Sequence, residues 1–341
     1  MRALPWLVAF VLLAGCLGGA EQRQREEEPA PPPAPTIGGV DVAALNWSEV
    51  SQGPTPRTEV VVGTLAGKIY VIGGFPLPDG LPPVPLTVPL TLVEVFEPAS
   101  GAWSRGPEYP LQVHHGAAVE LDGTLYVLGG LVTAGFQPTP LSFKLTPGAS
   151  AWTPIARMPA PRGSHAAAAI DGAIYLAGGT TSGGHVAEVW RYDPASDLWM
   201  QMDHRIPTPR DHTAGGAVQG KFCVAAGDVR GHGVNTNATE CYDPASGNWT
   251  VHAPVPVLRG SVAAAVWHDR LVVLGGQNAT RTFADVEAFD LANDTWLTLP
   301  PLNLARHGFG AAVVDGNLYA LYGGPRPGLT VTSSVEKLVI D

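Results

Sequence analysis

Five arginines recur along the chain at matching positions, and histidines or acids follow several of them within three residues. Guanidinium and imidazole groups that converge on one place would suit a carboxylate, an acidic sugar or an acidic loop of another protein. The residues behind this expectation are Arg57, Glu59, His114, His115, Arg162, His165, Arg210, Asp211, His212, Arg259, Arg306 and His307. Because a residue that recurs in every unit is often structural, local hydrogen bonding by each arginine stays open as the alternative.

Catalytic and metal motifs are absent from the sequence. It contains no His-x-x-x-His or Cys-x-x-Cys spacing, no Gly-x-Ser-x-Gly elbow and no phosphate-binding loop. We therefore expect no cofactor and no metal, although His114, His115, His212 and a nearby Asp stay open as ligands.

The elements that must position these residues form a repeat. An apolar strand runs into a pair of small residues six times, with pairs beginning at Gly73, Gly129, Gly178, Ala226, Gly275 and Gly323, so that successive pairs stand 48 to 56 residues apart. Before five of the pairs, an Arg stands nine residues ahead of a turn that is often Asp-Gly, a hairpin signal. After most pairs comes an aromatic residue, an acidic-Pro turn and a Trp, as in Tyr192-Asp193-Pro194 to Trp199.

This set of motifs resembles the kelch repeat family over roughly Val42 to Asp341. Departures are Val113 in place of an Arg, Ala226 in place of a Gly, and one extra residue before Gly323. The resemblance implies an all-β fold, a six-bladed kelch-type β-propeller over residues 42–341, with loops around a central channel. In such propellers one loop face would carry the candidate residues, together with the segments 75–88, 180–185 and 228–235.

The last repeat lacks its Trp, whereas an unmatched Trp47 stands near the beginning. We therefore expect the N-terminal strand to supply the outer strand of the last blade and close the ring.

The N-terminus predicts export and anchoring. An apolar run from Ala3 to Leu13, too short to span a bilayer, precedes Leu13-Ala14-Gly15-Cys16, which resembles a prokaryotic lipobox. Residues 1–15 then form a lipoprotein signal peptide, and Cys16 carries the lipid that anchors the protein to a membrane. Residues 16–41, rich in Glu and Pro, are expected to be a disordered stalk.

Two further features fit an extracytoplasmic location. Cys223 and Cys241 fall on neighbouring strands of the fourth repeat, where either a disulfide or two buried thiols would fit. Asn-x-Ser/Thr sequons suggest N-glycosylation at Asn46, Asn237, Asn248, Asn278 and Asn293, and together with the lipobox they suggest an archaeal cell surface.

The net charge of −10 and the lack of basic runs argue against a nucleic-acid partner. We expect a monomeric, membrane-tethered binding module without turnover that recognises a glycan or a protein. Two alternatives stay open: an acidic-sugar mutarotase or epimerase, which exported kelch propellers suggest by analogy, with Glu59 or Asp211 as acid/base beside an Arg clamp; and a purely structural envelope protein.

Overall fold

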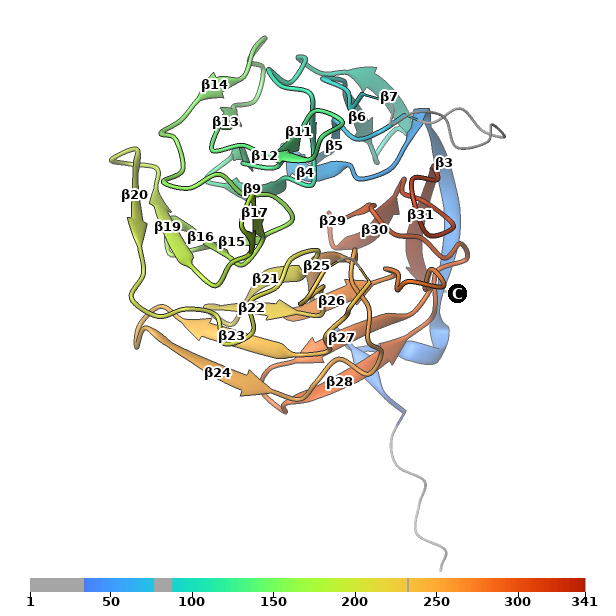
Figure 1. Cartoon of the computed structure of the whole chain (residues 1–341). Helices are drawn as coiled ribbons and strands as arrows, with labels where there is room; N and C mark the ends of the chain where they lie inside the picture. The colour runs from blue at the N-terminus through green and yellow to red at the C-terminus, as the bar shows by residue number, and fades with distance from the viewer. Residues whose placement is uncertain (1–33, 77–87, 232, 341) are drawn as a thin grey trace, which may run out of the picture. The chain divides into compact units, whose positions relative to one another are not determined.

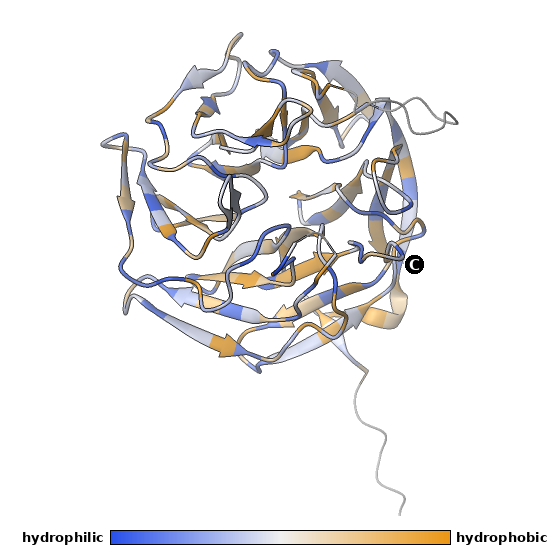
Figure 2. Cartoon of the chain, viewed as in Figure 1, coloured by the Kyte–Doolittle hydropathy of each residue, from blue (hydrophilic) through white to orange (hydrophobic). Residues whose placement is uncertain are grey.

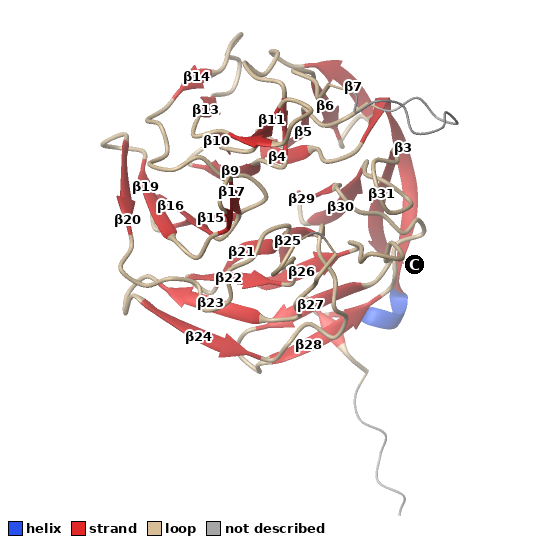
Figure 3. Cartoon of the chain, viewed as in Figure 1, coloured by secondary structure: helices blue, strands red, loops and turns tan. Residues whose placement is uncertain are grey.

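The computed structural model describes residues 34–76, 88–231 and 233–340. Apart from one short 3-10 helix, η1 (Val42–Ala44), all regular structure in this part of the chain is β-strand (Figure 3). No helix there is long and apolar enough to cross a membrane. The predicted signal peptide, Cys16 and most of the stalk lie outside the described residues.

Six four-stranded antiparallel sheets make up most of the described chain (Figure 1). The first two consist of β4 (Val61–Leu65), β5 (Lys68–Ile72), β6 (Val93–Glu97) and β7 (Ala102–Arg105), and of β9 (Ala117–Leu121), β10 (Thr124–Leu128), β13 (Ser142–Leu145) and β14 (Thr153–Pro154). The third and fourth consist of β15 (Ala166–Ile170), β16 (Ala173–Ala177), β19 (Val189–Asp193) and β20 (Leu198–Gln201), and of β21 (Ala214–Val218), β22 (Lys221–Ala225), β23 (Thr239–Asp243) and β24 (Asn248–His252). The fifth and sixth consist of β25 (Ala263–Trp267), β26 (Arg270–Leu274), β27 (Val286–Asp290) and β28 (Thr295–Leu299), and of β29 (Gly310–Val314), β30 (Asn317–Leu321), β31 (Thr332–Ile340) and β3 (Leu45–Arg57).

The sixth sheet joins the two ends of the described chain. Strand β3 pairs antiparallel with β31, and Trp47 lies opposite Leu338. The buried Trp47 ring also donates a hydrogen bond from Nε1 to the Pro300 carbonyl of the fifth sheet's last loop, at 2.9 Å. This is the pairing predicted for the N-terminal strand.

Regular structure is present before residue 42, within the predicted stalk. Strands β1 (Thr36–Ile37) and β2 (Val40–Asp41) pair as a hairpin. Ile37 is buried in a cluster with Leu45 and Trp47, because a branched apolar side chain gains by leaving water even in a polar stretch. The end of the predicted stalk is therefore part of the folded unit.

The sheets bury their apolar faces against one another. The inner strands contact each other in the order β4, β9, β15, β21, β25, β29 and then β4 again. Six apolar clusters each join side chains of two neighbouring sheets. Hydrophobic residues accordingly recur along strands such as β4 and β26 (Figure 2). This all-β, propeller-like arrangement agrees with the expectation from the repeats.

The paired small residues join one sheet to the next. Both residues of each of the first five pairs have positive φ, a conformation that glycine adopts at little cost. The second N–H of each pair donates to the carbonyl at the arginine position of the next repeat, for example Gly130 to Arg162 at 2.9 Å, and Gly323 donates to Arg57 at 3.0 Å. In the sixth repeat, Tyr322 and Gly323 have the positive φ and the hydrogen bond of the pair. Tyr322 therefore takes the place of the first glycine, and the sixth repeat has no extra residue before its pair.

Short strands and bridges hold the loops that follow these pairs. Strand β8 (Val113–His114) pairs with β11 (Leu131–Val132), which pairs with β12 (Gln137–Pro138), and β17 (Thr180–Thr181) pairs with β18 (Gly184–His185). Equivalent bridges join Asp211 to Asp228, Gly260 to Gln277 and His307 to Gly324. The loops are therefore held against the residues that follow the arginine positions.

Candidate functional site

The arginines lie inside the sheets. Each of the five is at most 1% exposed. The Arg57 guanidinium donates to the carbonyls of Gly73 and Leu92 and to Glu94 on β6, at 2.8 Å. Arg210, Arg259 and Arg306 likewise pair with Glu240, Glu287 and Glu336, and Arg162 donates to the carbonyls of Gly178 and Glu188. A buried guanidinium must find its partners locally, and carbonyls and carboxylates of the same sheet supply most of them, although Nε of Arg57, Arg162 and Arg210 has no hydrogen-bond partner among the described residues. The five arginines therefore do not line the candidate site. Their contacts match the alternative that each arginine makes local hydrogen bonds.

One residue from each repeat forms a ring, which we call the axial ring, two positions after the arginine position. Its members are Glu59, His115, Ser164, His212, Ser261 and Gly308. Each has a φ between +50° and +57°, and each N–H donates to the carbonyl of the preceding member at 2.6–3.3 Å. The bond from Glu59 to Gly308 completes the cycle. Since backbones converge here, side chains far apart in sequence become neighbours.

Glu59 lies between two histidines from other repeats. One carboxylate oxygen is 2.9 Å from His115 Nε2, and the other is 3.4 Å from His307 Nδ1. Burial alone would raise the pKa of Glu59, but the charges and hydrogen bonds of His115 and His307 hold that pKa well below its usual range. Glu59 is therefore a carboxylate at neutral pH.

His114 and His165 are buried neutral imidazoles. Burial, followed by the neighbouring His115, lowers the pKa of His114 to about 2. Burial and the charge of Arg162 lower the pKa of His165 to about 3. His165 lines two small cavities of about 110 and 140 Å³ along the inner strands, and neither ring nitrogen has a hydrogen-bond partner among the described residues.

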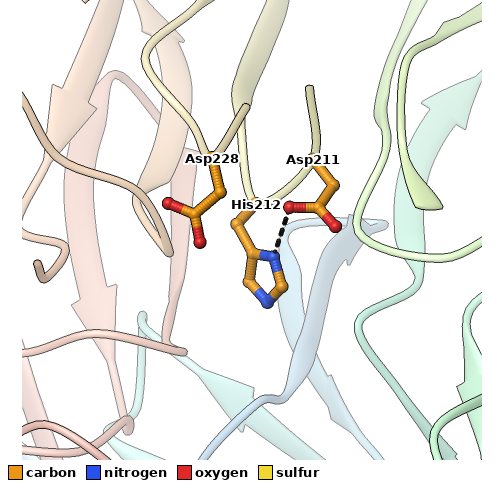
Figure 4. Close-up of side chains that lie close together, drawn as sticks. All are labelled: Asp211, His212 and Asp228. Atoms are coloured by element: carbon orange, nitrogen blue, oxygen red, sulfur yellow. Dashed lines mark hydrogen bonds and ion pairs between the residues drawn. The ribbon is translucent and has the colours of Figure 1, made fainter. Parts of the chain in front are cut away.

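On the other side of the axial ring, His212 bonds to its neighbour in sequence. Its Nδ1 is 2.8 Å from Asp211, and Asp228 lies on the opposite side of the imidazole (Figure 4). Burial opposes protonation, yet the hydrogen bond to Asp211 and the charges of Asp211 and Glu59 raise the pKa of His212 to about 9. The other Asp211 oxygen faces His185 Nδ1 at 3.2 Å. His212 is thus an imidazolium at neutral pH.

A cavity of about 340 Å³ opens beside these groups. It is lined by Glu59, His115, Phe136, His212, Gln277, His307, Gly328 and Leu329. Phe136 is 39% exposed and makes an edge-to-face contact with the His114 ring and a tilted contact with the His115 ring. The cavity therefore combines a carboxylate, an imidazolium and an amide with an exposed aromatic face, which suits hydrogen bonding and stacking to a polar ligand.

Comparisons with known proteins agree with the repeats. A family model of the KLHDC2/KLHL20/DRC7 Kelch-repeats domain matches residues 93–255, and the Kelch motif model matches residues 56–108 and 258–303. The chain belongs to the kelch-repeat proteins. It is 26% identical over 298 residues to Kelch-like protein terF of Aspergillus terreus, covering 82% of this chain and 64% of that protein.

Other similarities cover less or show only the fold. Kelch-like protein 35 of Mus musculus is 28% identical over 145 residues, which are 42% of this chain and 24% of that protein. The kelch chain thus spans less than two thirds of the length of these curated relatives. A solved structure titled "Structure of YjhT" superposes with a TM-score of 0.68 at 16% identity, covering 84% of this chain and 96% of that one.

The sequence-based candidates did not include four of the residues that line this cavity: Phe136, Gln277, Gly328 and Leu329. Gln277 follows a glycine pair, and that place in the repeat is a signal that could have found it. Phe136 and Leu329 come from loops that differ between repeats, so the repeat pattern gives no signal for them. The Glu partners of the arginines had a signal, since Glu94, Glu240 and Glu287 each stand two residues before an aromatic residue.

The remaining predicted residues are not among those that line the cavity. Cys223 and Cys241 are opposite one another on β22 and β23 and form a disulfide, which decides between the two alternatives. The sequon residues Asn46, Asn237, Asn248, Asn278 and Asn293 are all at least partly exposed, and their glycosylation stays a prediction. Cys16 lies outside the described residues.

Proposed function

We propose that this kelch-repeat protein is a membrane-tethered, extracytoplasmic binding module that takes a glycan or a polypeptide into the cavity beside the axial ring. The cavity's lining is the observation that carries this proposal. Hydrogen-bonding groups of Glu59, His212 and Gln277 stand beside the exposed ring of Phe136. Sugars and peptide loops both present polar groups next to apolar faces.

The proposal includes a six-bladed propeller whose ring is closed by strand β3. The contact of β29 with β4 and the pairing of β3 with β31 support it. A closed ring would hold the axial ring at a fixed diameter, and it would leave no sheet edge free to pair with another chain. Anchoring through a lipid on Cys16 would present this propeller at a membrane surface.

The five repeated arginines do not supply the guanidinium that the mutarotase alternative needs beside the sugar carboxylate, because they are buried within their sheets. We therefore propose binding without turnover.

The test is ligand capture by the full chain in detergent on glycan and peptide arrays, followed by affinity measurement. Phe136→Ser should weaken binding of the captured ligand about fivefold or more, since a stacked ring contributes about 1–3 kcal/mol. Leu198→Ser serves as the matched control, because Leu198 is an exposed apolar residue on the outer strand β20. Equal affinity of Phe136→Ser and wild type would place the ligand elsewhere and refute the proposal.

A further inference from the structure

Three arginines outside the repeat pattern are carried by neighbouring loops. Arg230, Arg281 and Arg326 each belong to a loop that follows a glycine pair, in the fourth, fifth and sixth repeats. All three are exposed, in contrast to the five buried arginines of the repeats. Among the residues that the structure describes, their guanidinium groups form no ion pair and no hydrogen bond. We call these three residues the arginine rim.

The loops that carry the arginine rim contact one another. An added Cβ on Gly233 of the first loop would lie 3.2 Å from Ala279 of the second. Thr282 Oγ1 of the second loop donates to the Pro325 carbonyl of the third at 2.7 Å. The second and third loops also supply three lining residues of the cavity of about 340 Å³, namely Gln277, Gly328 and Leu329. The arginine rim and the cavity therefore belong to one set of loops.

Hydrogen bonds fix the backbones of two of these arginines. Asn278 Oδ1 accepts from the Arg281 N–H at 3.0 Å, and the Asn278 N–H donates to the Arg281 carbonyl at 3.0 Å. Thr330 Oγ1 bonds to both the N–H and the carbonyl of Arg326, at 3.1 and 2.7 Å. The Arg281 guanidinium also lies over the Phe283 ring, 4.4 Å from its centre. Because these loops are already held, little ordering entropy is lost when a ligand binds to them.

The exposed charge of these loops is positive, although the chain has a net charge of −10. The corresponding loops of the second and third repeats, residues 131–138 and 180–185, contain no Lys, Arg, Asp or Glu. Asp228, the acid in the loops of the arginine rim, is buried and accepts from Asn235 and the Gly233 N–H. An exposed guanidinium without an ion-pair partner matches a carboxylate, which it binds through two parallel hydrogen bonds.

The cavity favours a different group on the same ligand. Glu59 lines it as a carboxylate, which only accepts hydrogen bonds, so the part of a ligand beside Glu59 presents donors. The hydroxyls of a sugar ring are such donors, and they stand next to an apolar ring face that fits the exposed Phe136. The side chains of an acidic peptide would instead bring further negative charge towards Glu59. A sugar that carries a carboxylate meets both requirements.

We propose that the arginine rim and the cavity together bind a segment of an acidic polysaccharide of the uronic-acid type. One sugar ring enters the cavity, and carboxylates of this and neighbouring units pair with Arg230, Arg281 and Arg326. Since the three arginines come from three repeats, they can contact carboxylates on successive units of one chain. This inference rests on the function proposed above and adds to it the charge of the ligand and the residues that recognise that charge.

The test measures binding of uronate oligosaccharides (galacturonate, guluronate and glucuronate) to the full chain in detergent. The methyl ester of each oligosaccharide is the matched neutral ligand, and oligoglutamate is the matched acidic peptide. At least one uronate should bind more tightly than its methyl ester. Its affinity should fall as NaCl is raised from about 0.05 to about 0.5 M, because salt screens exposed charges.

Substitutions in the arginine rim should weaken this binding. Arg230→Gln, Arg281→Gln and Arg326→Gln should each weaken uronate binding up to about fivefold, and the triple variant about tenfold or more, as expected for exposed ion pairs. None of these substitutions should change binding of the methyl ester. Gln keeps a polar side chain and removes only the charge, so the loss reports on the carboxylate contact.

A second triple variant is the matched control: Lys68→Gln, Lys221→Gln and Arg270→Gln. Each of these residues begins the second strand of its sheet (β5, β22 or β26), at the end opposite to the loops. The control removes the same number of positive charges and should bind uronates like the wild type. Equal loss in the control would show that only net charge matters and would overturn the proposal.

Three further results also overturn it: no binding of any uronate, equal binding of uronate and methyl ester, or tighter binding of oligoglutamate than of every uronate. The last would make the ligand an acidic polypeptide. Capture of a neutral ligand that Phe136→Ser weakens and the triple rim variant does not would refute this inference and leave the proposed function standing. Uronate binding that needs the rim but not Phe136 would support the rim as the carboxylate site and refute the cavity.

Discussion

Replacing Arg210 with Val should destabilise the protein much more than replacing Arg210 and Glu240 together. The Arg210 guanidinium is fully buried, lies 3.0 Å from Glu240 and donates to the Val224 carbonyl at 2.8 Å. Burial lowers the pKa of Arg210 to about 10 although Glu240 opposes this. At about 1.4 kcal/mol per tenfold change in proton affinity, the lowering corresponds to about 3 kcal/mol of burial cost that the pair does not offset.

The chain contains natural comparisons at this place. The second repeat has Val113 and Phe143 where the fourth has Arg210 and Glu240, and both apolar residues are buried in one cluster. The third repeat keeps Arg162 but has Trp190 at the Glu position. Among the described sheets, none keeps the Glu without the Arg. A buried carboxylate without its guanidinium is therefore the state that we expect to cost most.

The expected magnitudes follow from these comparisons. Arg210→Val should cost about 3–5 kcal/mol, since it leaves Glu240 buried with only Thr208 as a partner. Glu240→Phe should cost less, about 1–3 kcal/mol, because the Val224 carbonyl still accepts from the guanidinium. The double variant should lie within about 1 kcal/mol of wild type, because apolar residues can replace a buried ion pair.

Urea unfolding, followed by both tryptophan fluorescence and circular dichroism, measures these free energies as a double-mutant cycle. Arg205→Val is the control, since Arg205 is 64% exposed in its surface pair with Glu188 and should change stability by less than about 1 kcal/mol. A double variant as unstable as the sum of the single variants would refute the reasoning. So would a greater cost for Glu240→Phe than for Arg210→Val.

Three further predictions concern acid stability, the N-terminal strand and the membrane anchor. Since burial lowers the pKa of His165 to about 3 and the unfolded chain protonates near pH 6.5, stability should fall on acidification through this window, by up to about 1.4 kcal/mol per pH unit. His165→Asn should flatten this slope in urea unfolding between pH 7 and 4.5, while the exposed His204→Gln keeps it; an unchanged slope in His165→Asn contradicts the assignment. Trp47→Ala should lower the free energy of unfolding by about 3–5 kcal/mol. Deletion of residues 43–52 should abolish the cooperative thermal transition if β3 completes the sixth sheet. An unchanged melting curve of the deletion variant argues against that role of β3. Cys16→Ser should move the chain from the membrane fraction to the soluble fraction, and an intact mass without lipid on the wild type would contradict the anchor.

The repeat pattern was sufficient to predict much of the fold. Regular spacing of the glycine pairs, Asp-Gly turns and Trp residues gave the strand order, because each repeat must bury its apolar faces against the next. The unmatched Trp47 predicted the pairing of β3 with β31, and the template placed Cys223 opposite Cys241. Each of these inferences concerned contacts within one repeat or between the two ends of the described chain.

The candidate site was harder to predict, because it depends on side-chain direction and on contacts among repeats. The sequence places Arg57 at the start of a strand but does not show that its guanidinium turns towards the Gly73 carbonyl and Glu94. The joint loss of Arg and Glu in the second repeat, at Val113 and Phe143, was a signal that would have shown it. The axial ring has no local signal, because each of its hydrogen bonds joins residues of different repeats.

In the axial ring, all six repeats share one backbone conformation but carry different side chains. Its backbone is the same in six repeats, with a φ near +50° that glycine would adopt without strain, yet five of its members are not glycine. The exception is Gly308, where an added Cβ would come within 2.6 Å of the Glu59 carboxylate. Glycine therefore occupies the position where the Glu59 side chain needs room. The other five ring positions carry non-glycine residues with a positive φ. These non-glycine positions are consistent with the proposal above, in which the ligand contacts Glu59 and His212 of the axial ring rather than the buried repeated arginines.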